Sequence, residues 1–167
     1  RHLHARSART RELQDLVEAV TRLYLDRGYP SSGAYVPDQD LAGGELVIRV
    51  IEARLADVRV EGNRWYRDYW FRSRMMAAID SPVNVEQVEQ QLQLLLQEPD
   101  IAGVRGVLRP GAERGEDVLE LVVEERLPFD LNAAVANDNP PAIGEWRGQA
   151  FAADRSLLGF GDTLDLR

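Results

Sequence analysis

The sequence predicts an α+β fold in which a helix followed by two strands occurs twice along the chain. The chain aligns with itself without a gap, so that Val50 falls on Val122 and Leu16 falls on Val88. In each copy, apolar residues first recur with the helical period and then form short runs typical of strands. A helix packed on one face of a small sheet accounts for both patterns.

The helix of the first copy is predicted from an apolar stripe that shares one helical face and consists of Leu13, Leu16, Val20, Leu23 and Tyr24. Gly28 follows this stripe, and glycine suits the left-handed position after a helix. The second copy repeats the stripe from Val85 to Leu96. Asn84 is predicted to cap it, with Gln87 reaching back to the cap, and Pro99 to stop it.

The strands of each copy are predicted from short apolar runs between turn residues. The better-defined runs cover residues 46–51 and 118–123, and shorter ones precede them at 33–36 and 103–108. Turn signals at Pro37 and Pro110 separate the members of each pair. The two strands of a copy are therefore expected to be neighbours in a sheet.

The second copy carries an additional strand and helix at its front. Leu55, Val58 and Val60 alternate with polar residues, and a helical pattern that includes Tyr66, Tyr69 and Trp70 follows. The i, i+3, i+4 spacing of these three aromatic residues predicts packing against the sheet. The unit is therefore β-α-α-β-β. The first copy has no room for the opening strand and helix, so we expect a partial first module over 1–54 and a second module over 55–126.

The last part of the chain, residues 127–167, differs in character. Extended segments over 129–137, 145–154 and 162–167 alternate apolar and polar residues and are separated by turns. Such alternation is typical of transmembrane β-barrel strands and equally of any hairpin.

Composition and charge exclude several classes of function. The formal net charge is −8 and the pI about 4.8, which argues against nucleic-acid binding. The sequence has no cysteine and no phosphate-binding loop. Glu124 and Glu125 are adjacent on a predicted strand and face opposite sides, so they are expected to lie on a solvated edge and not to act as a catalytic pair. We expect no enzyme activity, cofactor, metal or small-molecule substrate.

Several segments in this order resemble the outer-membrane transporters of two-partner secretion, the haemolysin activation/secretion (TpsB) family. They are residues 24–34, 37–41, 44–46, 108–115, 137–139, 144–148 and 158–162. The resemblance implies tandem POTRA-type modules, the first one truncated, followed by the first strands of a transmembrane β-barrel. It also implies that the modules lie in the periplasm of a Gram-negative cell at the outer membrane, and that the partner is a large secreted exoprotein, either an adhesin or a cytolysin.

We expect the modules to bind the unfolded exoprotein by β-augmentation, in which an extended chain adds as a strand to a free sheet edge. The candidate edges precede a turn and pair only with the next strand; they are Ser32, Gly33, Ala34, Tyr35 and Val36, and Val104, Arg105, Gly106, Val107 and Leu108. Native edges are often covered, which would remove this function. The alternative is that the modules are structural or assembly-partner units without direct client binding, coupled to the barrel at Leu127 and Pro128.

Overall fold

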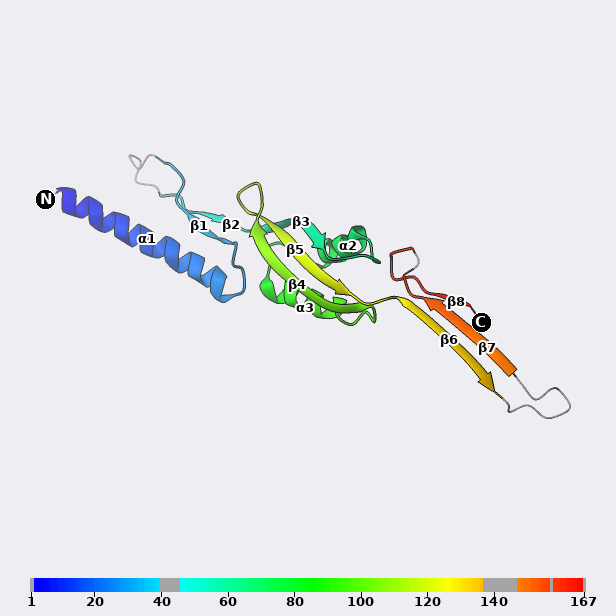
Figure 1. The fold of residues 1–167 in the computed structure, drawn as a ribbon. Helices are drawn as coiled ribbons and strands as arrows, with labels where there is room; N and C mark the ends of the chain where they lie inside the picture. The colour runs from blue at the N-terminus through cyan, green and yellow to red at the C-terminus, as the bar shows by residue number, and fades with distance from the viewer. Residues whose placement is uncertain (1, 40–45, 137–146, 157, 167) are drawn as a thin grey trace.

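The structure, a computed structural model, describes residues 2–39, 46–136, 147–156 and 158–166. Its elements follow one another along an elongated chain, with an N-terminal unit, a central unit and a C-terminal group of strands (Figure 1). Helices and strands mix within the chain, so the predicted α+β class is confirmed. No helix of the described residues is both long enough and apolar enough to cross a membrane.

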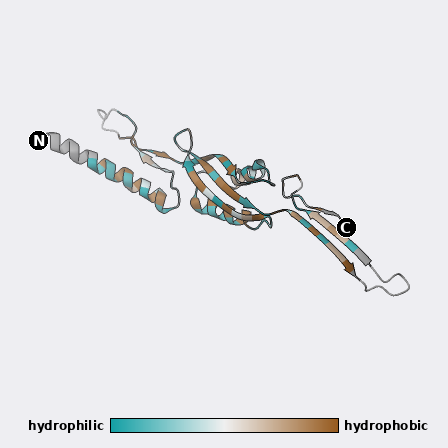
Figure 2. Ribbon diagram, in the orientation of Figure 1, coloured by the Kyte–Doolittle hydropathy of each residue, from teal (hydrophilic) through white to brown (hydrophobic). Residues whose placement is uncertain are grey.

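The N-terminal unit consists of a long helix and a small antiparallel sheet. Helix α1 (His2–Asp26) is followed by β1 (Gly33–Tyr35) and β2 (Arg49–Ile51), which pair with each other. Gly28 has a φ of +84°, as predicted for the residue after the helix. Hydrophobic and hydrophilic patches alternate along α1 (Figure 2). Strand β2 is shorter than the predicted run over 46–51.

The apolar stripe of α1 is less buried than its counterpart in the second copy. Leu16 and Leu23 are 49% and 46% exposed, whereas the residues aligned with them, Val88 and Leu95, are 5% and 3% exposed. The second pair is covered because the central unit has an additional strand and helix. In the described part of the N-terminal unit, β1 and β2 are the only elements against which α1 can pack. The two copies therefore share the helical pattern but not the extent to which it is buried.

The central unit has a three-stranded sheet in the order β3-β5-β4. Strands β3 (Arg54–Glu61) and β5 (Glu116–Glu125) are parallel, and β4 (Ile101–Pro110) is antiparallel to β5. Helices α2 (Asp68–Ala78) and α3 (Val85–Leu95) cover one face. The element order is β-α-α-β-β, as predicted.

The core of the central unit lies between this sheet and the two helices. Tyr66 and Trp70 are 3% and 5% exposed, and their ring centroids lie 4.6 Å apart. Burial raises the pKa of Tyr66 to about 12, and nearby carboxylates add to the shift. Tyr69, by contrast, is 68% exposed. The predicted packing is thus correct for two of the three aromatic residues, and wrong for Tyr69, which points away from the sheet.

The start of α3 follows the predicted cap in part. The Asn84 side chain accepts a hydrogen bond from the Glu86 N–H at 2.8 Å, which is an N-cap interaction. Gln87 does not reach back to Asn84. Its Oε1 instead accepts from the Asp80 N–H at 3.3 Å and ties the preceding loop to the helix.

Three short strands form a separate antiparallel sheet at the C-terminal end, in the order β6-β7-β8. They are β6 (Phe129–Ala136), β7 (Arg147–Asp154) and β8 (Leu164–Leu166). They fall within the predicted segments, although residues 137, 145–146 and 167 of those segments lie outside the described residues. Their assignment to a β-barrel stays a prediction.

Candidate functional site

Strand β4 contains the second candidate edge and, among the described strands, pairs only with β5. The turn after β4 shows which of its residues form main-chain hydrogen bonds with β5. In this turn the Gly111 N–H donates to the Glu116 carbonyl at 2.7 Å, so Gly111 and Glu116 form a bonded pair. Bonded and non-bonded pairs alternate along an antiparallel ladder. The main-chain groups of Val104, Gly106 and Leu108 therefore face away from β5.

Pro110 belongs to the same alternating set of residues, so its main-chain groups also face away from β5. Proline lacks an N–H and is tolerated at an edge where no ladder bond is required. In the described part of the chain, no side chain hydrogen-bonds to the outward N–H groups of Val104, Gly106 or Leu108. The candidate edge on β4 is thus a row of free backbone donors and acceptors.

The two faces of β4 differ in chemistry. Val104 and Leu108 are partly buried and pack against the core. Gly106 lets α3 approach closely, because a Cβ at this position would lie 3.2 Å from Leu92 and Leu119 methyl groups. The alternate residues Arg105 and Val107 are exposed on the face opposite the helices. A strand added at this edge would meet apolar groups on one face and an arginine on the other.

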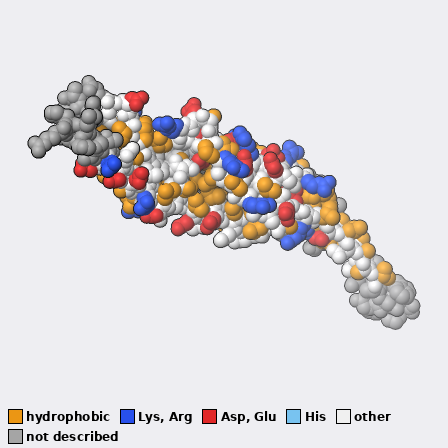
Figure 3. Space-filling view, turned by 60° about the vertical axis from the view of Figure 1, so that its left-hand side comes forward, with side chains coloured by type: hydrophobic (Ala, Val, Ile, Leu, Met, Phe, Trp, Pro, Cys, Tyr) orange, Lys and Arg blue, Asp and Glu red, His pale blue; other side chains and the backbone are white. Residues whose placement is uncertain are grey.

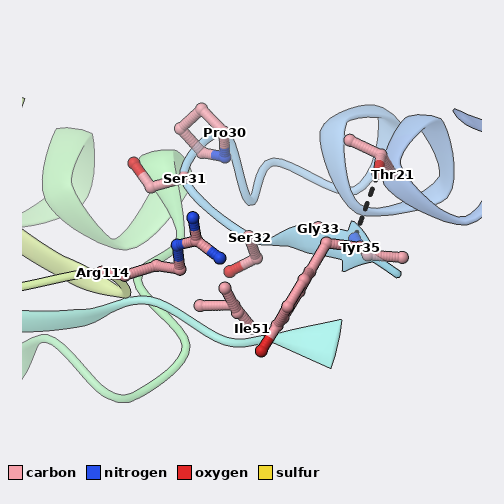
Figure 4. Close-up of a pocket in the computed structure, with 9 residues that line it drawn as sticks. Thr21, Pro30, Ser31, Ser32, Gly33, Tyr35, Ile51 and Arg114 are labelled. Carbon is pink, nitrogen blue, oxygen red and sulfur yellow. Dashed lines mark hydrogen bonds between the residues drawn. The ribbon is translucent and has the colours of Figure 1, made fainter. Parts of the chain in front are cut away.

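The first candidate edge, on β1, is covered by α1. The Ala34 N–H donates to the Thr21 hydroxyl at 3.1 Å, so it does not bond to β2 and is not free at the edge (Figure 4). Ser32 is 3% exposed, and its hydroxyl accepts from the Ala53 N–H at 3.0 Å. Ser32 is therefore buried and bonded to the end of the N-terminal unit, and it is not available to a client.

A pocket of about 320 Å³ lies beside β1 (Figure 4). Its lining includes residues 30–35 together with Thr21, Ile51 and Arg114. The Arg114 guanidinium lies 5.1 Å from the centre of the Tyr35 ring. Tyr35 thus belongs to a contact between the N-terminal and central units.

Strand β3 forms the other edge of the central sheet, and two features of this edge hinder the addition of a further strand. The register shifts between Leu55 and Asp57, which marks a bulge. The Val58 N–H donates to the Asp57 carboxylate at 2.8 Å. A local side chain therefore occupies a donor that a client strand would need.

Asp117 is a buried carboxylate near the contact between the N-terminal and central units. It is 1% exposed and its Oδ2 has no hydrogen-bond partner among the described residues. Burial raises the pKa of Asp117, and a hydrogen bond with Ser31 opposes this shift. The folded chain therefore binds the proton of Asp117 more tightly than the unfolded chain does.

The Asp117→Asn variant is expected to become more stable relative to the native chain as pH rises. A raised folded-state pKa gives stability that is complete below the ordinary pKa of about 3.9 and is lost as pH rises through the folded-state pKa. Urea unfolding between pH 4 and pH 7 measures this difference. The exposed Asp68→Asn serves as control, and a stability difference independent of pH would contradict the expectation.

The predicted junction residues Leu127 and Pro128 have opposite environments. Leu127 is 67% exposed, whereas Pro128 is fully buried. The Pro128 carbonyl accepts from the Arg155 N–H at 3.1 Å. Next to it, Phe129 makes an edge-to-face contact with Trp65, with ring centroids 5.2 Å apart. Arg155 and Trp65 were not predicted as junction residues.

Glu125 has a structural role that the sequence did not reveal. Its carboxylate accepts from the N–H groups of Arg64 and Trp65, both at 2.7 Å, and of Tyr66 at 3.2 Å. It thereby fixes the loop before α2. The expectation of a solvated edge is wrong for this residue. The three donors lie about sixty positions earlier in the chain, so no local pattern marks the contact.

Acidic and basic side chains are interspersed over the face shown in Figure 3, with hydrophobic side chains between them. The described residues contain no group of three or more His, Asp or Glu arranged to hold a metal ion. Arg54 and Glu116 form an ion pair at 2.5 Å, and Arg109 and Glu120 another at 3.2 Å, on the exposed face of the central sheet. The charged surface is thus of mixed sign.

Comparison with known proteins finds similarity to a POTRA domain and to outer membrane transporters. Residues 1–53 match the POTRA domain of the ShlB type. The outer membrane transporter CdiB of Dickeya dadantii (strain 3937) is 26% identical over 151 residues, covering 90% of this chain and 26% of the transporter. CdiB of Escherichia coli is 29% identical over 157 residues, covering 90% and 25%. The chain spans about a quarter of the length of these relatives.

Solved structures show the same relationship. CdiB from Escherichia coli matches with a TM-score of 0.61 and 25% identity, over 90% of this chain and 28% of that one. The N-terminal domain of Omp85 from the cyanobacterium Thermosynechococcus elongatus matches with a TM-score of 0.56 and 26% identity, over 70% and 53%. The similarity therefore extends over both units and into the strands that follow.

Proposed function

We propose that this chain is a POTRA region of the two-partner secretion type and that its strand β4 binds the secreted exoprotein in an unfolded state by β-augmentation. The relatives named above are outer membrane transporters, in agreement with the predicted location of the modules in the periplasm beside that membrane. Transport of an exoprotein through the complete protein is part of the proposal. Whether the exoprotein is an adhesin or a cytolysin is left open.

The observation that supports β4 is the difference between the edges of the described sheets. The Ala34 donor on β1 bonds to Thr21, and the Val58 donor on β3 bonds to Asp57. The outward groups of β4 have no such partners in the described residues. We therefore restrict the predicted client-binding residues to 104–108 and no longer include 32–36.

Backbone hydrogen bonds suit a receptor for an unfolded client because they do not depend on the client's side chains. The outward N–H and C=O groups of Val104, Gly106 and Leu108 each gain a partner when a strand is added. Each such bond contributes roughly 0.5–1.5 kcal/mol net. A few bonds of this size give weak, reversible binding, so the client can dissociate from β4 again.

Photo-crosslinking tests the position of the client. A crosslinking residue at Arg105 or Val107 is expected to capture a peptide that represents the N-terminal segment of the unfolded exoprotein. The same residue at Arg59, which is exposed on β3 at the opposite edge of the sheet, is expected to capture none. Equal capture at the two edges would show that β4 is not the preferred site.

Two substitutions at Val104 separate the backbone donor from the side chain. Val104→Pro removes the outward N–H without removing a bond to β5, whereas Val104→Ala removes packing and keeps the N–H. The proline variant is expected to bind the client roughly 3- to 10-fold more weakly than the alanine variant, as the loss of one net hydrogen bond implies. Equal affinities would exclude β-augmentation here. Circular dichroism confirms that both variants are folded.

The alternative function is that of a structural or assembly-partner unit of an outer-membrane barrel. The contacts around Pro128 favour it, because they attach the central unit firmly to the strands that follow. A soluble form of the chain that fails to retain the unfolded exoprotein in a pull-down, while the complete transporter still secretes it, would support this alternative over client binding.

A further inference from the structure

The central unit and the C-terminal strands are joined by an ion-pair cluster in which Asp100 is buried and Asp130 is exposed. The Arg155 guanidinium donates to the Asp100 carboxylate from Nε at 2.9 Å and approaches the same oxygen with a second nitrogen at 2.8 Å. It also pairs with Asp130 on β6. Asp100 lies just before β4 and is 1% exposed. One side chain therefore links two sheets.

Both carboxylates of the cluster stabilise the charged form of Arg155. The hydrogen bond with Asp100 raises the pKa of Arg155, and Asp130 adds to the shift. The Asp100 Oδ2 has no partner among the described residues. A buried carboxylate left without its cation is strongly unfavourable. Arg155 is thus the group that makes the burial of Asp100 tolerable.

The main chain strengthens the same connection on both sides of the arginine. The Arg155 N–H donates to the Pro128 carbonyl at 3.1 Å, and the Asp100 carbonyl accepts from the Arg126 N–H at 2.7 Å. The short link between β5 and β6 is therefore held at both ends.

A second contact joins the central unit to the loop before β8. The Arg67 N–H donates to the Gly159 carbonyl at 3.0 Å, and its Nε donates to the Leu158 carbonyl at 2.9 Å. The guanidinium lies 5.3 Å from the centre of the Phe160 ring. Gly159 has a φ of +82°, and a Cβ there would lie 2.8 Å from the Arg67 side chain. The loop before β8 thus rests directly against the start of α2.

We propose that Arg155 is a positioning residue that locks the central unit to β6 and β7, so that the β4 edge keeps one fixed orientation relative to the strands that follow. The lock consists of Asp100, Arg155 and Asp130, and the Arg67 contact supports it. Movement of the central unit about Leu127 and Pro128 is excluded while the lock is closed. This inference concerns geometry and holds whether or not β4 binds a client.

Spin labels on two introduced cysteines measure the distance between the central unit and β6. The chain has no cysteine of its own, so only the introduced positions are labelled. One label is placed on α3 with Gln93→Cys and the other on β6 with Asn132→Cys; both positions are exposed. The native chain is expected to give a single narrow distance distribution. Arg155→Ala is expected to lose this narrow peak, and Arg155→Lys to lose it in part, since a lysine does not offer the planar fork that reaches both carboxylates.

Two controls separate the lock from general stability. A label pair within the central unit, Gln93→Cys with Arg59→Cys, is expected to stay narrow in Arg155→Ala. Arg72→Ala, which removes an exposed ion pair with Asp57 inside the central unit, is expected to leave the distance to β6 unchanged. An unchanged distance to β6 in Arg155→Ala would overturn the proposal. Equal broadening of both label pairs would also overturn it, because Arg155 would then act on the fold as a whole.

Discussion

Phe71→Ala is expected to destabilise the central unit by about 3–5 kcal/mol, the range for removing a fully buried aromatic side chain. Phe71 is 0% exposed. Its ring lies 4.9 Å from Trp70 and 6.0 Å from Tyr66, centroid to centroid. The substitution removes both the transfer free energy of the ring and these contacts, and it leaves a cavity between α2 and the sheet.

A loss of this size is a large part of the roughly 5–15 kcal/mol by which domains are typically stable. Urea unfolding followed by tryptophan fluorescence measures it, since Trp70 lies in the same cluster. Tyr69→Ala is the matched control. Tyr69 lies on the same helix but is 68% exposed, and its loss is expected to change stability by less than about 0.5 kcal/mol. Similar effects of the two substitutions would mean that the core is packed differently.

The sequence was sufficient to predict the element order of the central unit, because each element has its own local pattern. The helical stripe from Val85 and the alternation at Leu55, Val58 and Val60 both depend on residues close together in the chain. The Asn84 cap and the glycine after α1 are local signals as well. For these features, the period and the turn residues determine the structure directly.

Burial and edge coverage were predicted less well, because they depend on residues distant in sequence. Leu16 aligns with Val88, yet their exposures differ widely since only the second is covered by an additional strand and helix. Tyr69 has the spacing of a core residue, but α2 is rotated so that this position faces solvent. The Thr21 bond that covers β1 joins residues thirteen positions apart, and no motif marks it.

The predicted junction residues lie between β5 and β6, and the contacts that surround them were not predicted. Leu127 and Pro128 were identified from the change in composition after them. The residues that fix the junction, Asp100, Asp130 and Arg155, come from a loop, a strand and a strand end that are far apart in sequence. In an acidic chain with many possible partners for each arginine, composition does not indicate which charges meet.

Gly62→Ala is expected to destabilise the central unit by about 2–4 kcal/mol, the combined cost of a left-handed backbone for a residue with a side chain and of a steric clash. Gly62 follows β3 and has a φ of +87°. A Cβ at this position would lie 2.3 Å from the Val123 carbonyl oxygen, which is a main-chain atom of the central strand β5. Relief of the clash therefore requires β3 and β5 to move apart at this point.

Gly103→Ala is the matched control, because it makes the same change in a strand of the same sheet. A Cβ there would lie 3.4 Å from the end of the flexible Glu124 side chain, and the residue does not have a positive φ. Its expected effect is within about 1 kcal/mol and of either sign, since alanine also reduces the entropy of the unfolded chain. Equal midpoints for the two variants in urea unfolding would show that the turn after β3 can relax without disturbing β5. A large loss for Gly62→Ala alone would show that the close contact between this turn and β5 is required for the sheet that presents the β4 edge.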